Sequence, residues 1–336
     1  MKREPKPSWH EVPAALRDDI SAIVGEPIVS AEVAWGGFGP TASFKLTTAA
    51  GSTFFCKGTH PGNTPEGHKA VLRECANLRT FHELARFGPS LLGLANLGDW
   101  HLAVLEFVPR AFEVPPWTRE ASDRAIARIA EFHASTPERA EASLADMQFT
   151  DLLSQSLNWY SLRDTANGRQ FASLFVDEAA AAAWLAAHLD RFTALADRSR
   201  TCSGPRGWMH ADIRSDNLIF AAEGRLLLVD WPVLSFGPQI LDIALFLPSL
   251  EGEGGPSCAD GLRLYEDAAA ARFDGADIAA AAAAIAGFFA ARAGQPEIEA
   301  LPRLRWVQKL QLFPALRWLA QCLDIAPPPL PRDFTA

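Results

Sequence analysis

Apolar and polar residues alternate along several stretches in the first third of the chain, which is the pattern of half-buried β-strands. Strands are expected at residues 28–35, 41–47, 52–57, 91–97 and 101–107. One longer stretch, residues 64–85, differs because its apolar residues recur near the helical period: Leu72, Leu78, Phe81 and Leu84. The pattern therefore predicts a small antiparallel sheet with one helix inserted between its strands.

Helical periodicity dominates the remainder of the chain. Helices are expected at residues 121–134, 150–162, 177–196, 261–271, 277–293 and 302–324, with a short one before the strands at 13–24. The Pro-rich segment 108–118 separates the two parts, because proline interrupts helices and strands alike. We expect an α+β protein of two lobes, residues 1–108 and 109–336, of which the second is larger and mainly helical.

Net charge, cysteine spacing and apolar runs indicate which kinds of partner to expect. The 336 residues carry a net charge of −9, which argues against nucleic-acid binding and favours a cationic small molecule. Five scattered cysteines without paired C-x-x-C spacing fit a reducing cytosol and give no zinc site. The longest apolar run, residues 278–291, is shorter than the roughly 20 residues that span a bilayer, and the N-terminus has no signal-like apolar core. We expect a cytoplasmic protein with no membrane partner, and its oligomeric state stays open.

The most specific chemical signal lies in the second part of the chain. His210, Asp212 and Asn217 occur as His-x-Asp-x-x-x-x-Asn, and Asp230 closes a later run of strand-forming residues. Phosphoryl transfer from ATP needs an Asp that accepts the proton of the attacking hydroxyl, with an Asn and a second Asp that hold magnesium. The interval between Asn217 and Asp230 leaves room for a hairpin turning at Glu223–Gly224. Asp and Asn are also common near turns for structural reasons, but chance would have to supply the whole set in this order.

This segment resembles the aminoglycoside phosphotransferase and choline-kinase-like family, whose fold is similar to that of the protein kinases. Three positions depart from the usual motifs: Ala211 stands for a glycine, Arg214 for a histidine or lysine, and Asp230-Trp231 for Asp-Phe-Gly. These replacements leave the charged atoms in place. The resemblance implies a bilobal protein-kinase-like fold and an enzyme that uses ATP and Mg²⁺.

The resemblance also implies roles for the reacting groups. Asp212 would orient and deprotonate the acceptor hydroxyl, and Arg214 would neutralise charge on the transferred group. Asn217 and Asp230 would hold the magnesium ions.

Two further residues are expected to support this loop. His210 would hold its conformation, and Asp242 would bond its backbone. Eleven residues separate Asp230 from Asp242, so the long activation segment with which protein kinases bind a peptide is missing. This deletion points to a small-molecule acceptor.

The first lobe is expected to bind the nucleotide. Lys57 ends a buried strand, where a charge needs a partner, and the kinase pattern supplies the phosphates and Glu74 on the following helix. Lys45 and Glu83 are weaker alternatives for this pair. The other expected nucleotide contacts lie in the glycine turn and at the hinge: Gly37, Phe38, Glu106 and Val108.

The acceptor is less determined than the reaction. The resemblance favours an aminoglycoside or related antibiotic, with choline, an amino alcohol or a sugar as the alternative. Glu251 and Glu253, in a Gly-rich loop, are the expected contacts for substrate amines, and Trp231 either lines the cleft or packs in the core. A catalytically idle kinase-like fold that binds a nucleotide is the other class of hypothesis. The intact set of charged residues speaks against it, because buried charges need a partner.

Overall fold

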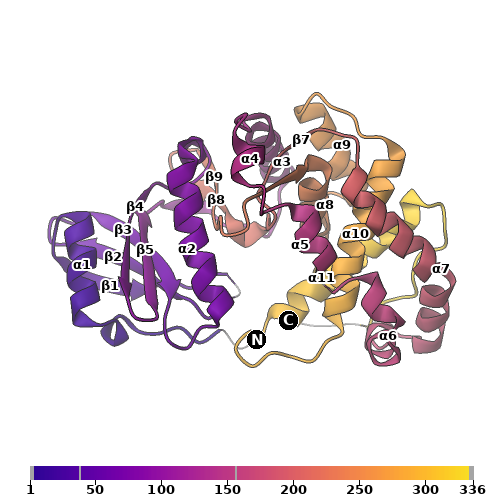
Figure 1. Cartoon of the computed structure of the whole chain (residues 1–336), viewed down its shortest axis with the longest axis horizontal. Helices are drawn as coiled ribbons and strands as arrows, with labels where there is room; N and C mark the ends of the chain where they lie inside the picture. Colours follow the sequence, from indigo (N-terminus) through magenta and orange to yellow (C-terminus); the bar gives the residue numbers. More distant parts are fainter. Residues whose placement is uncertain (1–3, 38, 156, 333–336) are drawn as a thin grey trace.

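The computed structural model describes residues 4–37, 39–155 and 157–332. Its first part is built on a five-stranded antiparallel sheet with the strand order β1-β2-β3-β5-β4 (Figure 1). The strands are β1 (Ile28–Val33), β2 (Ala42–Thr48), β3 (Thr53–Thr59), β4 (Leu91–Leu97) and β5 (Trp100–Glu106). These bounds confirm the predicted strands to within about two residues at each end.

One helix lies on each side of this sheet (Figure 1). Helix α1 (Ala14–Val24) buries Leu16 and Ile20 against alternate strand residues such as Phe44 and Leu102, all fully buried. Helix α2 (Pro65–Thr80) packs on β3 and β5 and begins at Thr64, whose side chain caps the Gly67 amide. Apolar faces on both sides explain why successive residues of the central strands are buried.

The helix expected over residues 64–85 ends earlier than predicted. The backbone of Phe81 (φ −113°, ψ 82°) leaves the helical region, and a 3₁₀ turn, η2 (His82–Arg86), follows. The apolar spacing continues through Phe81 and Leu84 because both side chains enter the large core of the second part of the chain. The apolar spacing after residue 80 therefore reflects burial of these side chains in the core and not a continuing helix.

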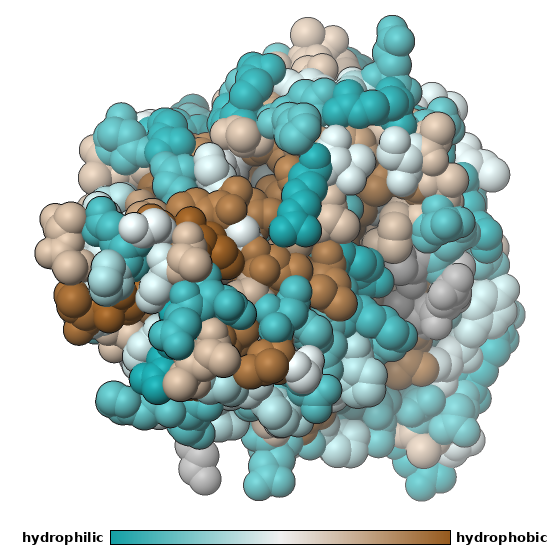
Figure 2. Space-filling view, turned by 60° about the vertical axis from the view of Figure 1, so that its left-hand side comes forward, coloured by the Kyte–Doolittle hydropathy of each residue, from teal (hydrophilic) through white to brown (hydrophobic). Residues whose placement is uncertain are grey.

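Apolar side chains also reach the surface of the first part. Val29, Trp35, Leu92 and Leu97 are each at least 40% exposed. Figure 2, which brings the sheet side of the molecule forward, shows apolar residues gathered in a band bordered by hydrophilic ones. Exposed apolar residues are common on folded proteins, so this band carries no functional assignment.

Short strands form a second structural layer between the sheet and the helices. A three-stranded sheet has the order β6-β8-β9, with β6 (Arg110–Phe112), β8 (Leu218–Ala221) and β9 (Leu226–Leu228). Strands β7 (Arg206–Met209) and β10 (Ser235–Pro238) pair with each other. The β8–β9 hairpin turns at Gly224, whose positive φ of 90° suits glycine, as the sequence predicted.

The rest of the chain is helical and surrounds one large apolar core. The longer helices are α3 (Arg119–Ala134), α7 (Glu178–Arg198), α8 (Gln239–Gly252), α9 (Cys258–Ala268), α10 (Gly275–Ala293) and α11 (Leu304–Cys322). The shorter ones are α4 (Ala140–Ser143), α5 (Phe149–Gln155), η3 (Trp159–Arg163), α6 (Thr165–Ala172), η4 (Ser199–Thr201) and η5 (Ser215–Asn217), and one more 3₁₀ turn, η1 (Trp9–Glu11), precedes α1 in the first part. An antiparallel sheet followed by a mainly helical part confirms the predicted kinase-like architecture.

The helical part differs from the prediction at several elements, two of which share a physical cause. The single helix expected over residues 150–162 is instead two elements, α5 and η3, and Asn158 caps the second by accepting a bond from the Tyr160 amide. Helices α4, α6 and α8 were not predicted. Of these, α6 begins at Asp164, whose carboxylate accepts hydrogen bonds from the amides of Ala166 and Asn167. Both differences arise at Asn or Asp side chains that bond the backbone locally, a signal that apolar periodicity does not contain.

Helix α10 is long and rich in alanine. It is long and apolar enough to cross a membrane by length and composition, but 78% of its most apolar window is buried inside the protein. It packs against α7, α8 and α11. Its alanine-rich sequence is therefore used for close helix packing in the core.

Candidate functional site

The loop that follows β7 carries the predicted reacting groups, and Asp242 on α8 holds its backbone. The Asp242 carboxylate is fully buried and accepts hydrogen bonds from the amides of His210 at 2.8 Å and Ala211 at 2.7 Å. His133 on α3 donates to the same carboxylate at 3.0 Å. Ala211 has a φ of 62°, in the left-handed region that favours glycine. This backbone conformation explains physically why a glycine is usual at that position.

Asp212 is half-buried, next to Asn217 from the same loop. The Asn217 Nδ2 donates to the Asp212 main-chain oxygen at 2.8 Å and to its Oδ2 at 3.2 Å. Arg214 approaches that Oδ2 at 3.5 Å and also pairs with Asp216 at 3.2 Å. Burial raises the pKa of Asp212 to about 7, against the opposing effect of Arg214. A carboxylate with this pKa, 35% exposed, is suited to accept a proton from a bound hydroxyl near neutral pH.

Lys57 on β3 pairs with one carboxylate from α2 and with another from the segment after β9. Its Nζ lies 2.9 Å from Glu74 Oε1 on α2 and 2.9 Å from Asp230 Oδ1 beyond β9. Burial opposes the charge on Lys57, but the two carboxylates outweigh it and raise the pKa of the ammonium. Burial raises the pKa of Glu74, whereas Lys57 lowers the pKa of Asp230 in spite of burial. Of the alternatives, Lys45 stacks over the Phe107 ring and Glu83 pairs with Arg139, so neither joins this network.

The β8–β9 hairpin brings the predicted metal ligands to one end. Leu218 pairs with Leu228 in the ladder, and the Val229 amide donates to the Asn217 main-chain oxygen at 3.0 Å. Asp230, the next residue, has a φ of 75°. The hairpin therefore sets Asn217 beside the segment that carries Asp230.

Residues at this hairpin end fit a magnesium ion. Among the described residues no group of three or more His, Cys, Asp or Glu side chains is arranged to hold a metal. Mg²⁺ does not need such a group, because it takes one or two protein oxygens and completes its shell with water and phosphate. Asn217 donates through Nδ2, which leaves its side-chain oxygen as an acceptor, and Asp230 is 41% exposed. An amide oxygen and a reachable carboxylate form a donor set suited to this hard cation.

The remaining predicted nucleotide contacts lie at the glycine turn and the hinge. The Gly37 carbonyl accepts a hydrogen bond from Arg303 at 2.5 Å. Phe38 lies outside the residues that the structure describes. Glu106 accepts from the Ser90 amide at 3.2 Å and pairs with Arg225 at 2.9 Å, and Val108 packs against Ala221 and Leu227. The structure thus uses Glu106 and Val108 to join β5 to the β8–β9 hairpin.

His210 and Trp231 lie behind the loop, in the core. The His210 Nε2 lies 3.0 Å from the Val229 carbonyl, and burial lowers the pKa of its ring. Trp231 is 1% exposed and packs against His210 and Phe132, with centroids 4.6 and 5.4 Å away. The prediction of Trp231 as a substrate contact is therefore corrected to the core alternative, because a ring buried to this degree presents no face to a ligand.

The two acidic residues predicted to contact substrate already have protein partners. Glu253 accepts from Ser215 Oγ at 2.7 Å and from Trp117 Nε1 at 2.9 Å. Glu251 accepts from the Cys258 amide at 2.7 Å and pairs with Arg317 at 2.9 Å. The geometry assigns Glu253 to the reacting loop, because Ser215 lies between Asp212 and Asn217. This link, like the bond from His133 to Asp242, joins elements far apart in sequence and left no local pattern.

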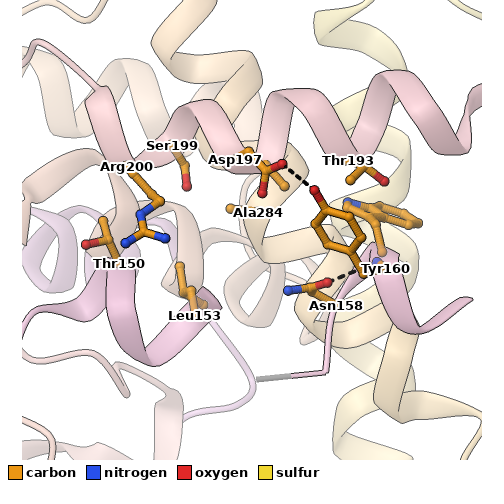
Figure 3. Close-up of a pocket in the computed structure, with 11 residues that line it drawn as sticks. Thr150, Leu153, Asn158, Tyr160, Thr193, Asp197, Ser199, Arg200 and Ala284 are labelled. Atoms are coloured by element: carbon orange, nitrogen blue, oxygen red, sulfur yellow. Dashed lines mark hydrogen bonds between the residues drawn. The ribbon is translucent and has the colours of Figure 1, made fainter. Parts of the chain in front are cut away.

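A small cavity in the helical part lies apart from these residues. It has a volume of about 30 Å³ and lies between α5, η3 and α7 (Figure 3). Its charged side chains already have protein partners: Tyr160 donates to Asp197 at 2.8 Å, and Arg200 pairs at 3.0 Å with Asp151, which lies outside the cavity. A space of about one water molecule without unsatisfied reactive groups does not offer a second site.

Comparisons with known proteins agree with this geometry. The model of the phosphotransferase enzyme family matches residues 30–280. An aminoglycoside-3'-phosphotransferase of type VIII is 19% identical with a TM-score of 0.51, covering 81% of this chain and 99% of its own. Spectinomycin phosphotransferase in complex with ADP and spectinomycin is 13% identical, with a TM-score of 0.54 and coverages of 89% and 93%. The choline kinase LicA from Streptococcus pneumoniae is 18% identical, with a TM-score of 0.57 and coverages of 91% and 98%. A search of curated proteins found no match.

Proposed function

Because the chain belongs to the phosphotransferase enzyme family, we propose that it transfers the γ-phosphate of ATP to a hydroxyl group of a small cationic molecule. The observation that carries this proposal is the position of Lys57, whose ammonium lies 2.9 Å from both Glu74 and Asp230. In kinases this arrangement steadies the nucleotide phosphates next to the metal. The spectinomycin phosphotransferase crystallised with ADP supports a nucleotide as the donor.

In the proposed reaction Asp212 takes the proton of the attacking hydroxyl. The acceptor oxygen forms a bond to the γ-phosphorus while the bond to the departing ADP oxygen breaks. Arg214, held 3.5 Å from Asp212 and 3.2 Å from Asp216, would offset charge on the transferred group. Asn217 and Asp230 would hold Mg²⁺, which when bound neutralises charge on the phosphates.

The acceptor we favour is an aminoglycoside or related antibiotic, since two of the compared structures are phosphotransferases of this kind. Choline, another amino alcohol or a sugar is the alternative, supported by the choline kinase among the compared structures. The net charge of −9 favours a cation in either case.

The test is ADP release from Mg-ATP by the purified protein in the presence of aminoglycosides, spectinomycin, choline, aminopropanol and simple sugars. One class of compound should stimulate release, and Asp212→Asn should reduce the stimulated rate by about 10²–10⁴-fold, as expected for loss of a general base. Asp190→Asn, on the exposed face of α7 and paired with Arg163, is the matched control and should keep the wild-type rate. An Asp212→Asn variant as active as this control would refute the assigned base.

A further inference from the structure

The N-terminal segment forms a contact that joins the glycine turn to the helical part. Glu4, 1% exposed at its side chain, accepts hydrogen bonds from Arg303 at 3.0 Å, immediately before α11. Arg303 also donates to the Gly37 carbonyl at 2.5 Å. Further along the segment, the Trp9 ring packs edge-on against Phe44 of β2 at 5.2 Å. Residues 4–9 are therefore fixed at both ends, and Figure 1 shows this end of the chain between the sheet and α11.

Lys6 lies between these two anchors and points at β2. Its Nζ donates to Ser43 Oγ at 2.5 Å and to the Thr41 carbonyl at 3.4 Å. Ser43 is the direct partner of Lys57 in the β2–β3 ladder. Residues directly opposite in an antiparallel pair have side chains on one face, with Cβ atoms about 4.5–5.5 Å apart. Lys6 therefore reaches the same face of the sheet as Lys57.

Lys6 differs from the neighbouring cations Lys57 and Arg303 in having no carboxylate paired with it among the described residues. Lys57 is paired with Glu74 and Asp230, and Arg303 with Glu4. Among the described residues Lys6 forms no ion pair, and its partners are a hydroxyl and a carbonyl. Burial, with Arg303 and Lys57 nearby and only Glu4 opposing them, lowers the pKa of Lys6 to about 8. A half-buried ammonium beside a second cation is a suitable partner for a polyanion.

We propose that Lys6 is a second phosphate-binding lysine, which the N-terminal segment presents to the nucleotide beside Lys57. This inference rests on the proposed function and adds to it a contact from outside the kinase motifs. The Glu4–Arg303 pair acts as a positioning element, because it fixes the segment and the Gly37 carbonyl together. The ligand chemistry is the diphosphate or triphosphate of a nucleotide, not its base or sugar.

The test compares the affinities of ADP and adenosine by isothermal titration calorimetry. Lys6→Met keeps most of the aliphatic stem and removes the charge, so it should weaken ADP by about 10–100-fold, as expected for a lost charged hydrogen bond. Adenosine affinity should stay within about twofold of wild type, because adenosine carries no phosphate. Lys6→Arg should restore most of the ADP affinity. Glu4→Gln should weaken ADP in the same direction but less.

Lys69→Met is the matched control, because Lys69 pairs with Glu66 on the exposed face of α2. It should bind ADP as wild type does. Wild-type ADP affinity in Lys6→Met overturns the inference while leaving the proposed function intact. Tighter ADP binding in Lys6→Met also overturns it, because Lys6 would then hinder nucleotide binding. Equal weakening of ADP and adenosine also overturns it, since that would mean a damaged fold. A wild-type protein that binds no nucleotide overturns the proposed function and this inference together.

Discussion

The Asp242 carboxylate accepts a hydrogen bond from the main-chain amide of Ala211 at 2.7 Å, and both residues are buried. The same carboxylate also accepts from His210 and His133. One side chain from α8 therefore fixes the backbone immediately before Asp212.

Replacing Asp242 with asparagine should destabilise the protein strongly. The amide group presents N–H where His210, Ala211 and His133 also donate, so at least one buried donor loses its acceptor. We expect a loss of about 3–5 kcal/mol in the free energy of unfolding, as for a broken buried charged network. Urea denaturation measures it. Asp19→Asn, at an exposed position inside α1, should change the same quantity by less than about 0.5 kcal/mol, and equal losses in the two variants would contradict the role of Asp242.

Ala211→Gly should be nearly neutral for stability. Glycine relieves the strain of the left-handed backbone, which should raise the free energy of unfolding by about 1–2 kcal/mol. The lost buried methyl group and the greater entropy of glycine in the unfolded chain should together lower it by about 1–2 kcal/mol, so the two effects nearly cancel. Ala186→Gly, at an exposed position inside α7, should instead cost about 1 kcal/mol. Chemical denaturation of both variants checks this difference, and a cost at position 211 as large as at 186 would argue against a strained Ala211.

Mutation of Glu253 distinguishes a role in positioning the loop from a role in binding the substrate amine. A residue that positions the loop through Ser215 should affect kcat, whereas a residue that binds the substrate amine should affect the KM of the acceptor. We expect Glu253→Gln to lower kcat about tenfold, because the amide replaces one of two acceptors and loosens the loop that carries Asp212. The KM of the acceptor should change less than twofold.

Steady-state kinetics on the identified acceptor measure both constants for Glu253→Gln. Glu251→Gln serves as the comparison, since Glu251 bonds Cys258 and Arg317 away from the loop. It should leave kcat unchanged. A raised KM with an unchanged kcat in Glu253→Gln would restore the substrate-binding role expected from sequence.

Cys56 should make stability fall at alkaline pH. Burial raises the pKa of this thiol to about 12, well above its usual value of about 8.5 in the unfolded chain. Between these values the unfolded state has lost a proton that the folded state keeps. The contribution is therefore complete below about pH 8.5 and is lost by about 1.4 kcal/mol per pH unit above it.

Urea unfolding at pH 8, 9 and 10 tests this dependence by comparing the wild type with Cys56→Ala. The variant should be less stable at pH 8, because the buried sulfur is gone, but its stability should fall less steeply as the pH rises. Parallel curves for the two proteins would show that Cys56 does not contribute to the alkaline slope.

The sequence predicted most of the architecture because strands, helices and the reacting loop leave local signals. The interval from Asn217 to Asp230 indicated a hairpin, and β8 and β9 form it. Helix ends were less predictable, since Phe81 keeps the apolar spacing after the helix has ended. The expected site residues Lys57, Glu74 and Asp230 meet in the structure, although 156 positions separate Glu74 from Asp230.

Other parts of the site could not be predicted, because their partners are distant in sequence and ordinary in type. Nothing local marks Glu253 as a partner of Ser215, and a Glu in a Gly-rich loop is equally suited to a ligand. The pair of Glu4 and Arg303 spans nearly the whole chain. Such contacts depend on how the lobes pack, which the hydrophobic pattern does not specify.

The two bonds of Lys57 have a mechanical consequence. Glu74 lies on α2 against the five-stranded sheet and Asp230 follows β9, so Lys57 links these two parts of the molecule. When a nucleotide binds, Lys57 would contact its phosphates and Asp230 would contact the bound cation. The direct ion pair between Lys57 and Asp230 would then be replaced by a link through the phosphates and the cation. We therefore expect the distance between the lobes to be similar in the empty and the loaded protein, so that their radii of gyration in small-angle X-ray scattering nearly coincide.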